Sequence, residues 1–483
     1  MLFNSLEYLI FFPVVCILFF ALSQRFRWSL LLIASCIFYM YFIPIYIFIL
    51  FFTIIIDYIA GLVIEGAQGR KRKAFLILSL VANIGVLCVF KYYNFFVINL
   101  EHISSVNLPL IKILLPIGLS FHTFQAMSYT IEVYRGNYKA EKHFGIYALY
   151  VMFFPQLVAG PIERPQNMLH QFHEKKFFKY DLAVSGLRLI LWGMIKKVVI
   201  ADRLAQFVGP VFDHPQDYPG IAIAMAAFFF SFQIFCDFSG YTDIAIGSAR
   251  VMGFKLMVNF NKPYHSRSIS EFWKRWHISL STWFKDYLYI PLGGNRVPLP
   301  RAYFNIFIVF LISGFWHGAN WTFIAWGALH GFYLLFGQAT APLRKKVTGT
   351  LGIGKIHWLQ NMLNVVTVFV LVTFAWIFFR ALNMQYAVDL IVRMKNIPSE
   401  LSGVIRTHSI NSLKMPLGNN AILLCLGFIF LLEMVHIAEV KYDIMKLLDN
   451  RPPALRWTLY YAGILLIFFL GVFGSHSFIY FQF

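Results

Sequence analysis

The sequence predicts an all-α protein that crosses a membrane many times. Of its 483 residues, 59% are hydrophobic and only 13% are charged, whereas soluble domains are about 45–50% apolar and about 25% charged. The apolar residues form long stretches separated by short polar breaks. Because lipid offers the backbone no hydrogen-bond partners, such stretches must be helices, or re-entrant segments that protein or water shields.

Thirteen apolar stretches follow one another along the chain, and we expect roughly ten to thirteen membrane or re-entrant helices, a few of them too short to span alone. The first stretch lacks the basic start and small-residue cleavage site of a secretory signal, which favours a retained first helix. No linker or internal repeat divides residues 1–483, so we expect a single domain. The stretches are Leu6–Leu22, Leu30–Phe42, Ile45–Ile64, Ala74–Val89, Ile113–Met127, Ile146–Val158, Leu182–Val199, Ile221–Cys236, Phe304–Phe315, Phe323–Phe336, Met362–Phe379, Ala421–Val435 and Leu459–Val472.

The formal net charge of +19 does not indicate a nucleic-acid partner, because no basic recognition helix or motif accompanies it. In a membrane protein such an excess usually marks cytoplasmic loops and contacts with anionic lipid. The five cysteines lie among apolar neighbours without metal-like spacing, so we expect neither disulfides nor a metal site. The basic clusters are Arg70–Lys73, Lys175–Lys176 and Arg344–Lys346.

Two regions interrupt the apolar pattern: an aromatic and charged block at Asp237–Arg301, and a less apolar stretch at Met394–Asn420. Within the first, Ser268 or Ser270 can cap a helix that carries Glu271 in its first turn. We expect this helix to continue to Pro291. It is too polar to face lipid, so it should lie at an interface or line a cavity.

Two histidines in and beside this block are candidates for chemistry. His317 falls in the apolar span that begins with Phe304–Phe315 and continues onward, where an ionisable group is functional by default. An imidazole is well suited to accept a proton from a hydroxyl near neutral pH. The alternative, a core histidine bonded to a backbone carbonyl, applies more strongly to His277 and His330. The absence of a GxSxG motif argues against a serine triad.

Five motifs carry a resemblance to a known family. The chain resembles the membrane-bound O-acyltransferases, and within that family it is similar to the membrane subunits of bacterial alginate O-acetyltransferases. The matching motifs cover most of residues 110–335, whereas 1–109 and 336–483 agree only as hydrophobic helices. The motifs are PIGLSFHTFQAMSYTIEVYRG at 116–136, FFPQLVAGPIERP at 153–165, DFSGYTDIAIG at 237–247, NFNKPYHSRSISEFWKRWHISLSTWFKDYLYIPLGGN at 259–295 and SGFWHGANWTFIAWGALHG at 313–331.

This resemblance implies a catalytic histidine at His317 and a partner at His277, close together on a central tunnel through a helical bundle. It implies a bacterial inner-membrane enzyme with no permanently bound cofactor. The donor would be cytoplasmic acetyl-CoA, and the acetyl group would reach an extracytoplasmic polysaccharide such as alginate through an extracytoplasmic acetyltransferase partner.

We hypothesise that His317 is the base, and that His277 orients the acyl group or donates a hydrogen bond to the oxyanion. For the residues proposed to line the tunnel, helix capping, an interfacial basic face or headgroup anchoring are the structural alternatives. The run around Glu163 and Arg164 is interpreted as a structural break with a local ion pair. The tunnel candidates are Asp237, Ser239, Tyr241, Trp276, Arg275, Trp316 and His330.

Two other functions compete with this interpretation. A transporter should show paired half-helices or an inverted repeat, and the sequence shows neither. D-alanyl transfer from a carrier protein in teichoic acid modification shares the two histidine motifs. The residues of the motif FHTFQAMSYTIEVYRG and the length of 483 residues favour acetyl transfer. The acceptor stays open between alginate, another exopolysaccharide such as cellulose, and peptidoglycan.

Overall fold

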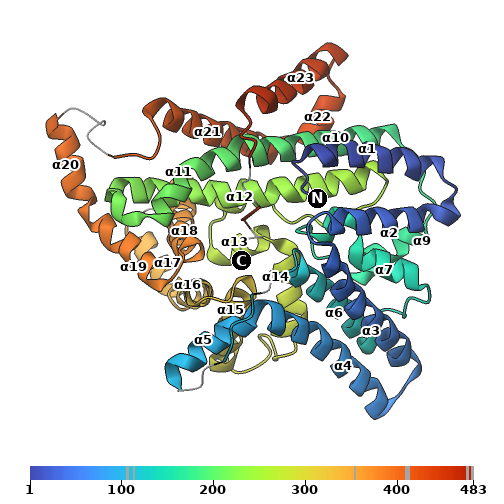
Figure 1. Cartoon of the computed structure of the whole chain (residues 1–483). Helices are drawn as coiled ribbons and strands as arrows, with labels where there is room; N and C mark the ends of the chain where they lie inside the picture. The colour runs from blue at the N-terminus through green and yellow to red at the C-terminus, as the bar shows by residue number, and fades with distance from the viewer. Residues whose placement is uncertain (105–107, 113–114, 353–354, 408–413, 475–477, 480–483) are drawn as a thin grey trace. The chain divides into compact units, whose positions relative to one another are not determined.

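A computed structural model describes residues 1–104, 108–112, 115–352, 355–407, 414–474 and 478–479. Every regular element among these residues is a helix, as the sequence predicts (Figure 1). They form two compact units: Met1–Met194 with Tyr241–Val258, and Ile195–Gly240 with Asn259–Ile479. Each unit is described on its own, and the expectation of a single domain stays a prediction.

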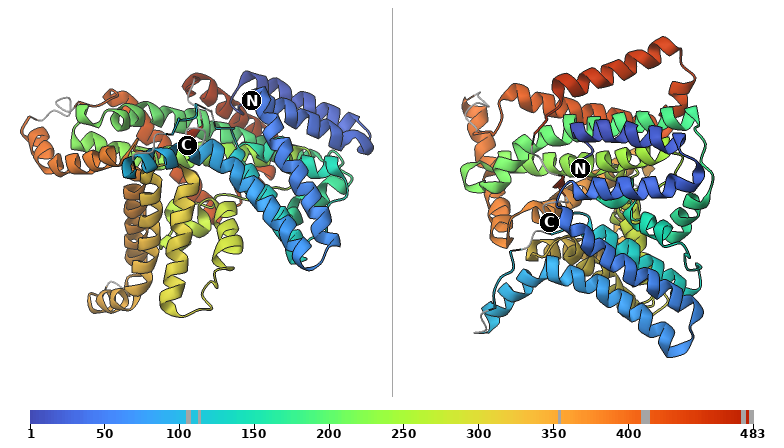
Figure 2. Two further views of the ribbon diagram at one scale, coloured as in Figure 1. Left: turned by 60° about the horizontal axis from the view of Figure 1, so that its bottom comes forward. Right: turned by 45° about the vertical axis from the view of Figure 1, so that its right-hand side comes forward.

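The first unit contains a group of three helices that pack side by side, α3, α4 and α6 (Figures 1 and 2). Gly61 of α3 lies against Tyr129 of α6 so closely that a Cβ atom would come within 2.7 Å of the phenol ring. The buried carboxyl group of Asp57 accepts hydrogen bonds from Ser79 Oγ (2.6 Å) and Asn83 Nδ2 (2.9 Å) of α4, as a buried polar group requires. The helices of this unit are α1 (Leu6–Ala21), α2 (Gln24–Met40), η1 (Pro44–Tyr46), α3 (Ile47–Gly66), α4 (Gly69–Leu87), η2 (Cys88–Tyr92), α5 (Tyr93–Ile103), α6 (Leu119–Arg135), α7 (Phe144–Met152), α8 (Phe154–Leu157), α9 (Pro165–His173) and α10 (Tyr180–Met194).

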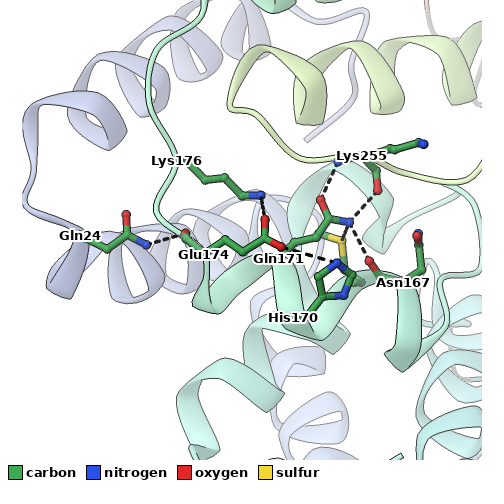
Figure 3. A network of polar contacts seen from close by, with 8 residues as sticks. Gln24, Asn167, His170, Gln171, Glu174, Lys176 and Lys255 are labelled. Carbon is green, nitrogen blue, oxygen red and sulfur yellow. Dashed lines mark hydrogen bonds and ion pairs between the residues drawn. The ribbon is translucent and has the colours of Figure 1, made fainter.

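Polar side chains at α9 hold the segment 255–257 of the same unit. Gln171 accepts a hydrogen bond from Lys255 N (2.8 Å) and donates one to Lys255 O (2.9 Å), as Figure 3 shows. Glu163, which has no solvent exposure, accepts from Met257 N (2.6 Å). Burial raises the pKa of this carboxyl to about 7. These contacts support a structural role for the run around Glu163.

The second unit contains the most closely packed helix pair, α15 and α16, which run side by side (Figures 1 and 2). A Cβ atom on Gly314 would lie 2.2 Å from Phe323 O, and one on Gly327 would lie 2.3 Å from Phe310 O. The two backbones meet at these glycines, a usual device between membrane helices. The helices of this unit are η3 (Ile195–Ala201), α11 (Asp202–Asp213), η4 (Pro215–Asp217), α12 (Gly220–Val251, whose end belongs to the first unit), η5 (Pro263–His265), α13 (Ile269–Arg275), α14 (Ile278–Phe284), η6 (Lys285–Tyr289), α15 (Leu299–His317), α16 (Trp321–Ala339), α17 (Ala341–Thr350), α18 (His357–Arg380), α19 (Met384–Arg393), η8 (Met394–Asn396), α20 (Ile397–Thr407), α21 (Asn419–Lys441), α22 (Ile444–Asp449) and α23 (Pro453–Leu470).

Seven helical segments of the described residues are long and apolar enough to cross a membrane, which confirms a multi-pass membrane protein. The other predicted stretches form helices that are shorter or more polar, in line with the expectation that some do not span alone. The seven segments are Pro44–Gly66, Gly69–Ile103, Gly220–Val251, Leu299–His317, His357–Arg380, Asn419–Lys441 and Pro453–Leu470.

The polar block does not form the single helix predicted from Ser268 to Pro291. Its start is confirmed: Ser268 caps α13, and its side chain accepts a hydrogen bond from Glu271 N (3.1 Å). The helix ends at Arg275, however, and a second helix, α14, begins at Ile278. The prediction of one continuous helix was wrong because His277 takes a left-handed backbone conformation, which an α-helix cannot contain.

Candidate active site

The site is built around His277, the residue that separates α13 from α14. Its backbone has φ 44° and ψ 56°, a region that residues other than glycine rarely adopt and that carries strain of about 1–3 kcal/mol. Its side chain is fully buried. Backbone strain of this kind clusters at functional sites, where the surroundings enforce it.

Asn259 forms hydrogen bonds with His277 and with the residues that follow it. Its Oδ1 lies 3.1 Å from His277 Nδ1, and it accepts hydrogen bonds from Ser279 N (3.2 Å) and Ser279 Oγ (2.9 Å). The backbone carbonyl oxygen of Asn259 also accepts a hydrogen bond from Ile278 N (2.9 Å). One asparagine therefore holds the side chain of His277 and the first turn of α14 together.

This arrangement selects one tautomer of His277. A backbone N–H can only donate, so the Asn259 atom that bonds Ser279 N must be the oxygen. The same oxygen can only accept from His277 Nδ1, which therefore carries a proton. Burial lowers the pKa of His277 to about 3, so the ring is neutral near pH 7. In this form the lone pair of the imidazole is on Nε2.

His317 is the last residue of α15 and is only 5% exposed. Its ring is surrounded by the rings of Trp316, Trp326 and Phe379, with centroid distances of 5.0, 5.0 and 5.4 Å. The C-terminal end of a helix carries partial negative charge. His317 stands at this end of α15.

Trp316 lies near both histidines, which are 40 residues apart in the sequence. Its ring centroid is 5.0 Å from that of His317 and 6.5 Å from that of His277. The catalytic pairing of the two histidines stays a prediction.

A pocket of about 480 Å³ lies between α13, α14, η6, α15 and α16, and the residues that line it do not include His277 or His317. Its wall includes Ile278, next to His277, and Ser313, one helical turn before His317. Lys274 and Lys285 also line it, and most of the remaining wall is apolar. Its volume falls in the usual range of about 300–1,000 Å³ for small-molecule sites. An apolar pocket with two lysines suits an acyl group attached to an anionic carrier.

Trp276 and His330 belong to the packed aromatic core of this unit. Trp276 is 1% exposed and stacks on Phe272 at 5.6 Å. The ring of His330 lies parallel to that of Phe272, and its Nδ1 accepts a hydrogen bond from Trp273 Nε1 (3.3 Å). These contacts favour a packing role for both residues.

Arg275 lies at the end of α13 and is about one-third exposed. Its guanidinium forms an ion pair with Glu271 Oε1 (2.6 Å), one helical turn earlier. This intrahelical pair matches the interfacial alternative considered for Arg275. The neighbouring Lys274, which lines the pocket, is better placed to meet an anionic ligand.

Two of the tunnel candidates bind buried lysines. Lys197 Nζ lies 2.6 Å from Asp237 Oδ1, and Lys196 Nζ donates to Ser239 Oγ (3.0 Å). Tyr241 belongs to the first unit, where its ring packs on Phe3 at 4.4 Å. The tunnel proposed from the sequence stays a prediction for these three residues.

Sequence reasoning missed Lys196, Lys197 and Asn259. The two lysines could have been noticed, because they lie within the apolar stretch Leu182–Val199, where charge is rare. Lys197 also pairs with Asp202 Oδ1 (2.8 Å), which completes a buried ion-pair triad with Asp237. Asn259 gave no such signal, because an asparagine in a loop is common.

Comparison with known proteins places these motifs in a family. The model of the membrane-bound O-acyltransferase family matches residues 142–382, which include both histidines. A Pseudomonas aeruginosa protein named "Probable alginate O-acetylase" is 42% identical over 394 residues, covering 80% of this chain and 73% of that protein. A Helicobacter pylori peptidoglycan O-acetyltransferase is 37% identical over 78% of this chain and 75% of its own length. A Streptococcus thermophilus teichoic acid D-alanyltransferase is 32% identical, but over only 48% of this chain and 58% of its own length.

Proposed function

Since this chain belongs to the membrane-bound O-acyltransferase family and is an O-acyltransferase of the membrane, we propose that it moves an acetyl group from acetyl-CoA to a hydroxyl. The observation that carries this proposal is the pair of buried imidazoles, His277 and His317, whose rings both lie near Trp316, together with an apolar pocket lined by Ile278, Ser313 and two lysines. General base chemistry and an acyl-sized pocket are the two requirements of such a reaction.

In the proposed reaction His317 removes the proton from the acceptor hydroxyl. The oxygen attacks the carbonyl carbon of the thioester, the new C–O bond forms, and the C–S bond then breaks. The departing thiolate takes the proton from the His317 imidazolium, so base and proton are both restored. The negative end of α15 supports the transient positive charge.

His277 has a different part in this proposal. A neutral ring with its proton on Nδ1 offers a lone pair at Nε2, so it accepts a hydrogen bond and has no Nε2 proton to donate to an oxyanion. We therefore favour orientation of a reacting group by His277 over the oxyanion role considered from the sequence. Asn259 acts through His277 and is a positioning residue.

We propose an extracytoplasmic polysaccharide as the final acceptor, at the bacterial inner membrane, and an extracytoplasmic acetyltransferase as the partner that completes the transfer. The names of relatives support this class: one is an alginate O-acetylase and another a peptidoglycan O-acetyltransferase. Both acceptors are bacterial glycan polymers. D-alanyl transfer is less favoured, because the teichoic acid relative matches less than half of this chain.

The donor can be identified with purified protein in liposomes. Acetyl-CoA labelled in its acetyl group and a D-alanyl carrier protein labelled in its alanyl group are supplied in separate reactions, with alginate or peptidoglycan fragments as acceptors and with the extracytoplasmic acetyltransferase partner added on the acceptor side. We expect loss of label from acetyl-CoA and gain of base-labile label on one glycan. Consumption of the D-alanyl carrier alone would overturn the acetyl proposal and leave the family assignment intact.

A further inference from the structure

A cluster of metal-ligating side chains lies in the second unit, apart from the two site histidines. His265 is the last residue of η5, and Glu433 and His436 lie one turn apart on α21. His265 Nε2 is 2.7 Å from Glu433 Oε2, and His436 Nδ1 is 3.2 Å from Glu433 Oε1. One ligand atom from each residue can be chosen so that all three lie within 4.8 Å of one another.

The surroundings favour a bound cation at this cluster. Glu433 lies inside a segment that is long and apolar enough to span a membrane, where a carboxylate is costly unless it is paired or coordinated. Its side chain is 27% exposed, and that of His436 is 9% exposed. His265 and His436 both contact this carboxylate, and a divalent cation held by all three side chains would offset its charge.

The donor set and spacing match zinc. Two imidazole nitrogens and one carboxylate oxygen form a zinc ligand set with bonds of about 2.0–2.2 Å, which places neighbouring ligand atoms of a tetrahedron about 3.3 Å apart. The contacts of 2.7 and 3.2 Å go to different oxygens of Glu433, and one ligand atom from each residue lies within 4.8 Å of the others. Zinc binding would therefore draw the widest pair together by up to about 1.5 Å. Three protein ligands leave the fourth position to water or another ligand.

We propose that His265, Glu433 and His436 bind one Zn²⁺ ion, through Nε2, a carboxylate oxygen and Nδ1 respectively. This site goes beyond the proposed acyl transfer and does not depend on it. Its position gives it a structural role, because it joins η5 to α21, two segments that lie 168 residues apart. The ion pair of Lys262 with Glu439 (3.6 Å) joins the same two segments.

The cluster also lies next to the aromatic core that contains Trp276, the residue before His277. Phe235 packs against the His436 ring at 5.5 Å and against Trp276 at 6.2 Å. Tyr264, which precedes His265, contacts Trp276 at 6.1 Å. Zinc binding would therefore stabilise the aromatic core that holds the end of α13.

The test is the zinc content of the full-length protein, purified in detergent with a tag that contains no histidine and freed of loosely bound metal by gel filtration. We expect one equivalent of zinc by mass spectrometry, and an increase in melting temperature when zinc is returned to protein stripped with a chelator. Glu433→Gln and His265→Ala should each abolish stoichiometric zinc and weaken its binding by more than the roughly 10–100-fold that outer-shell substitutions produce.

His173→Ala is the matched control. His173 also contacts a carboxylate, that of Glu141 (2.8 Å), but it lies outside the cluster of His265, Glu433 and His436. This variant should keep its zinc. The proposal is overturned if the wild-type protein binds no zinc, or if the variants at Glu433 and His265 bind it as tightly as the wild type. The trio would then be a hydrogen-bonded clamp between η5 and α21. Size-exclusion profiles of all variants separate loss of zinc from loss of folding.

Discussion

Replacing Asn259 with alanine removes the acceptor that fixes His277. Three hydrogen bonds are lost, from His277 Nδ1, Ser279 N and Ser279 Oγ. At roughly 1 kcal/mol for each neutral bond, the loss is about 3 kcal/mol, which corresponds to a factor of roughly 100 in rate if it falls on the transition state. We expect kcat for acyl transfer by purified protein in liposomes to fall about 100-fold, with a smaller change in the KM of the donor.

Two further variants separate positioning from folding. Ser279→Ala removes only the hydroxyl bond to Asn259 and should change kcat by a few-fold at most. Asn259→Asp keeps the acceptor and adds a negative charge beside His277, which raises the pKa of the imidazole. It should restore much of the activity and move the acidic limb of the pH profile to higher pH. The reasoning is refuted if Asn259→Ala turns over at the wild-type rate, or if Ser279→Ala loses as much activity as Asn259→Ala.

Three other predictions test the packing. Gly327→Ala should separate α15 from α16 and strongly lower both the melting temperature and the activity, because its Cβ would lie 2.3 Å from a backbone carbonyl oxygen. The control is Gly337→Ala in the same helix: its Cβ would meet nothing within 4 Å, so both quantities should stay at the wild-type values. Because the folded pKa of Glu163 is raised to about 7 from 4.5, the folded state favours its neutral form, so this group's contribution to stability is lost as pH rises from about 4.5 to 7. The melting temperature of Glu163→Gln should therefore fall less than that of the wild type over this pH range. Parallel curves of melting temperature against pH for the two proteins would contradict this prediction. His330→Phe should keep at least one-tenth of the wild-type transfer rate, since His330 packs among aromatic rings. Complete loss of transfer by this variant would instead indicate that His330 takes part in catalysis.

The sequence was sufficient to predict features that depend on local pattern. The all-α membrane fold follows from composition and apolar stretches, and the start of α13 follows from Ser268 as its cap with Glu271 in its first turn. His317 was proposed as a site residue because an ionisable group stands out next to an apolar stretch, and its catalytic role stays a prediction. These features depend on residues within one or two helical turns.

Features that depend on distant residues could not be predicted. The left-handed conformation of His277 goes with hydrogen bonds to Asn259, 18 residues earlier, and no local propensity favours it in a histidine. Asp237 was a tunnel candidate, but its pairing with Lys197 is visible only in the folded chain. The contact of His265 with Glu433 spans 168 residues. In each case tertiary contacts decide what the side chain does.

The acyl-transfer account is tested most directly at His317. Purified wild-type protein and His317→Gln in liposomes are given acetyl-labelled acetyl-CoA, a glycan acceptor and the extracytoplasmic acetyltransferase partner, and the label on the glycan is measured over time. Removal of a general base lowers the rate by roughly 10²–10⁴-fold, so we expect that loss in the variant, with its size-exclusion profile and melting temperature unchanged. Transfer by His317→Gln at the wild-type rate would contradict the account.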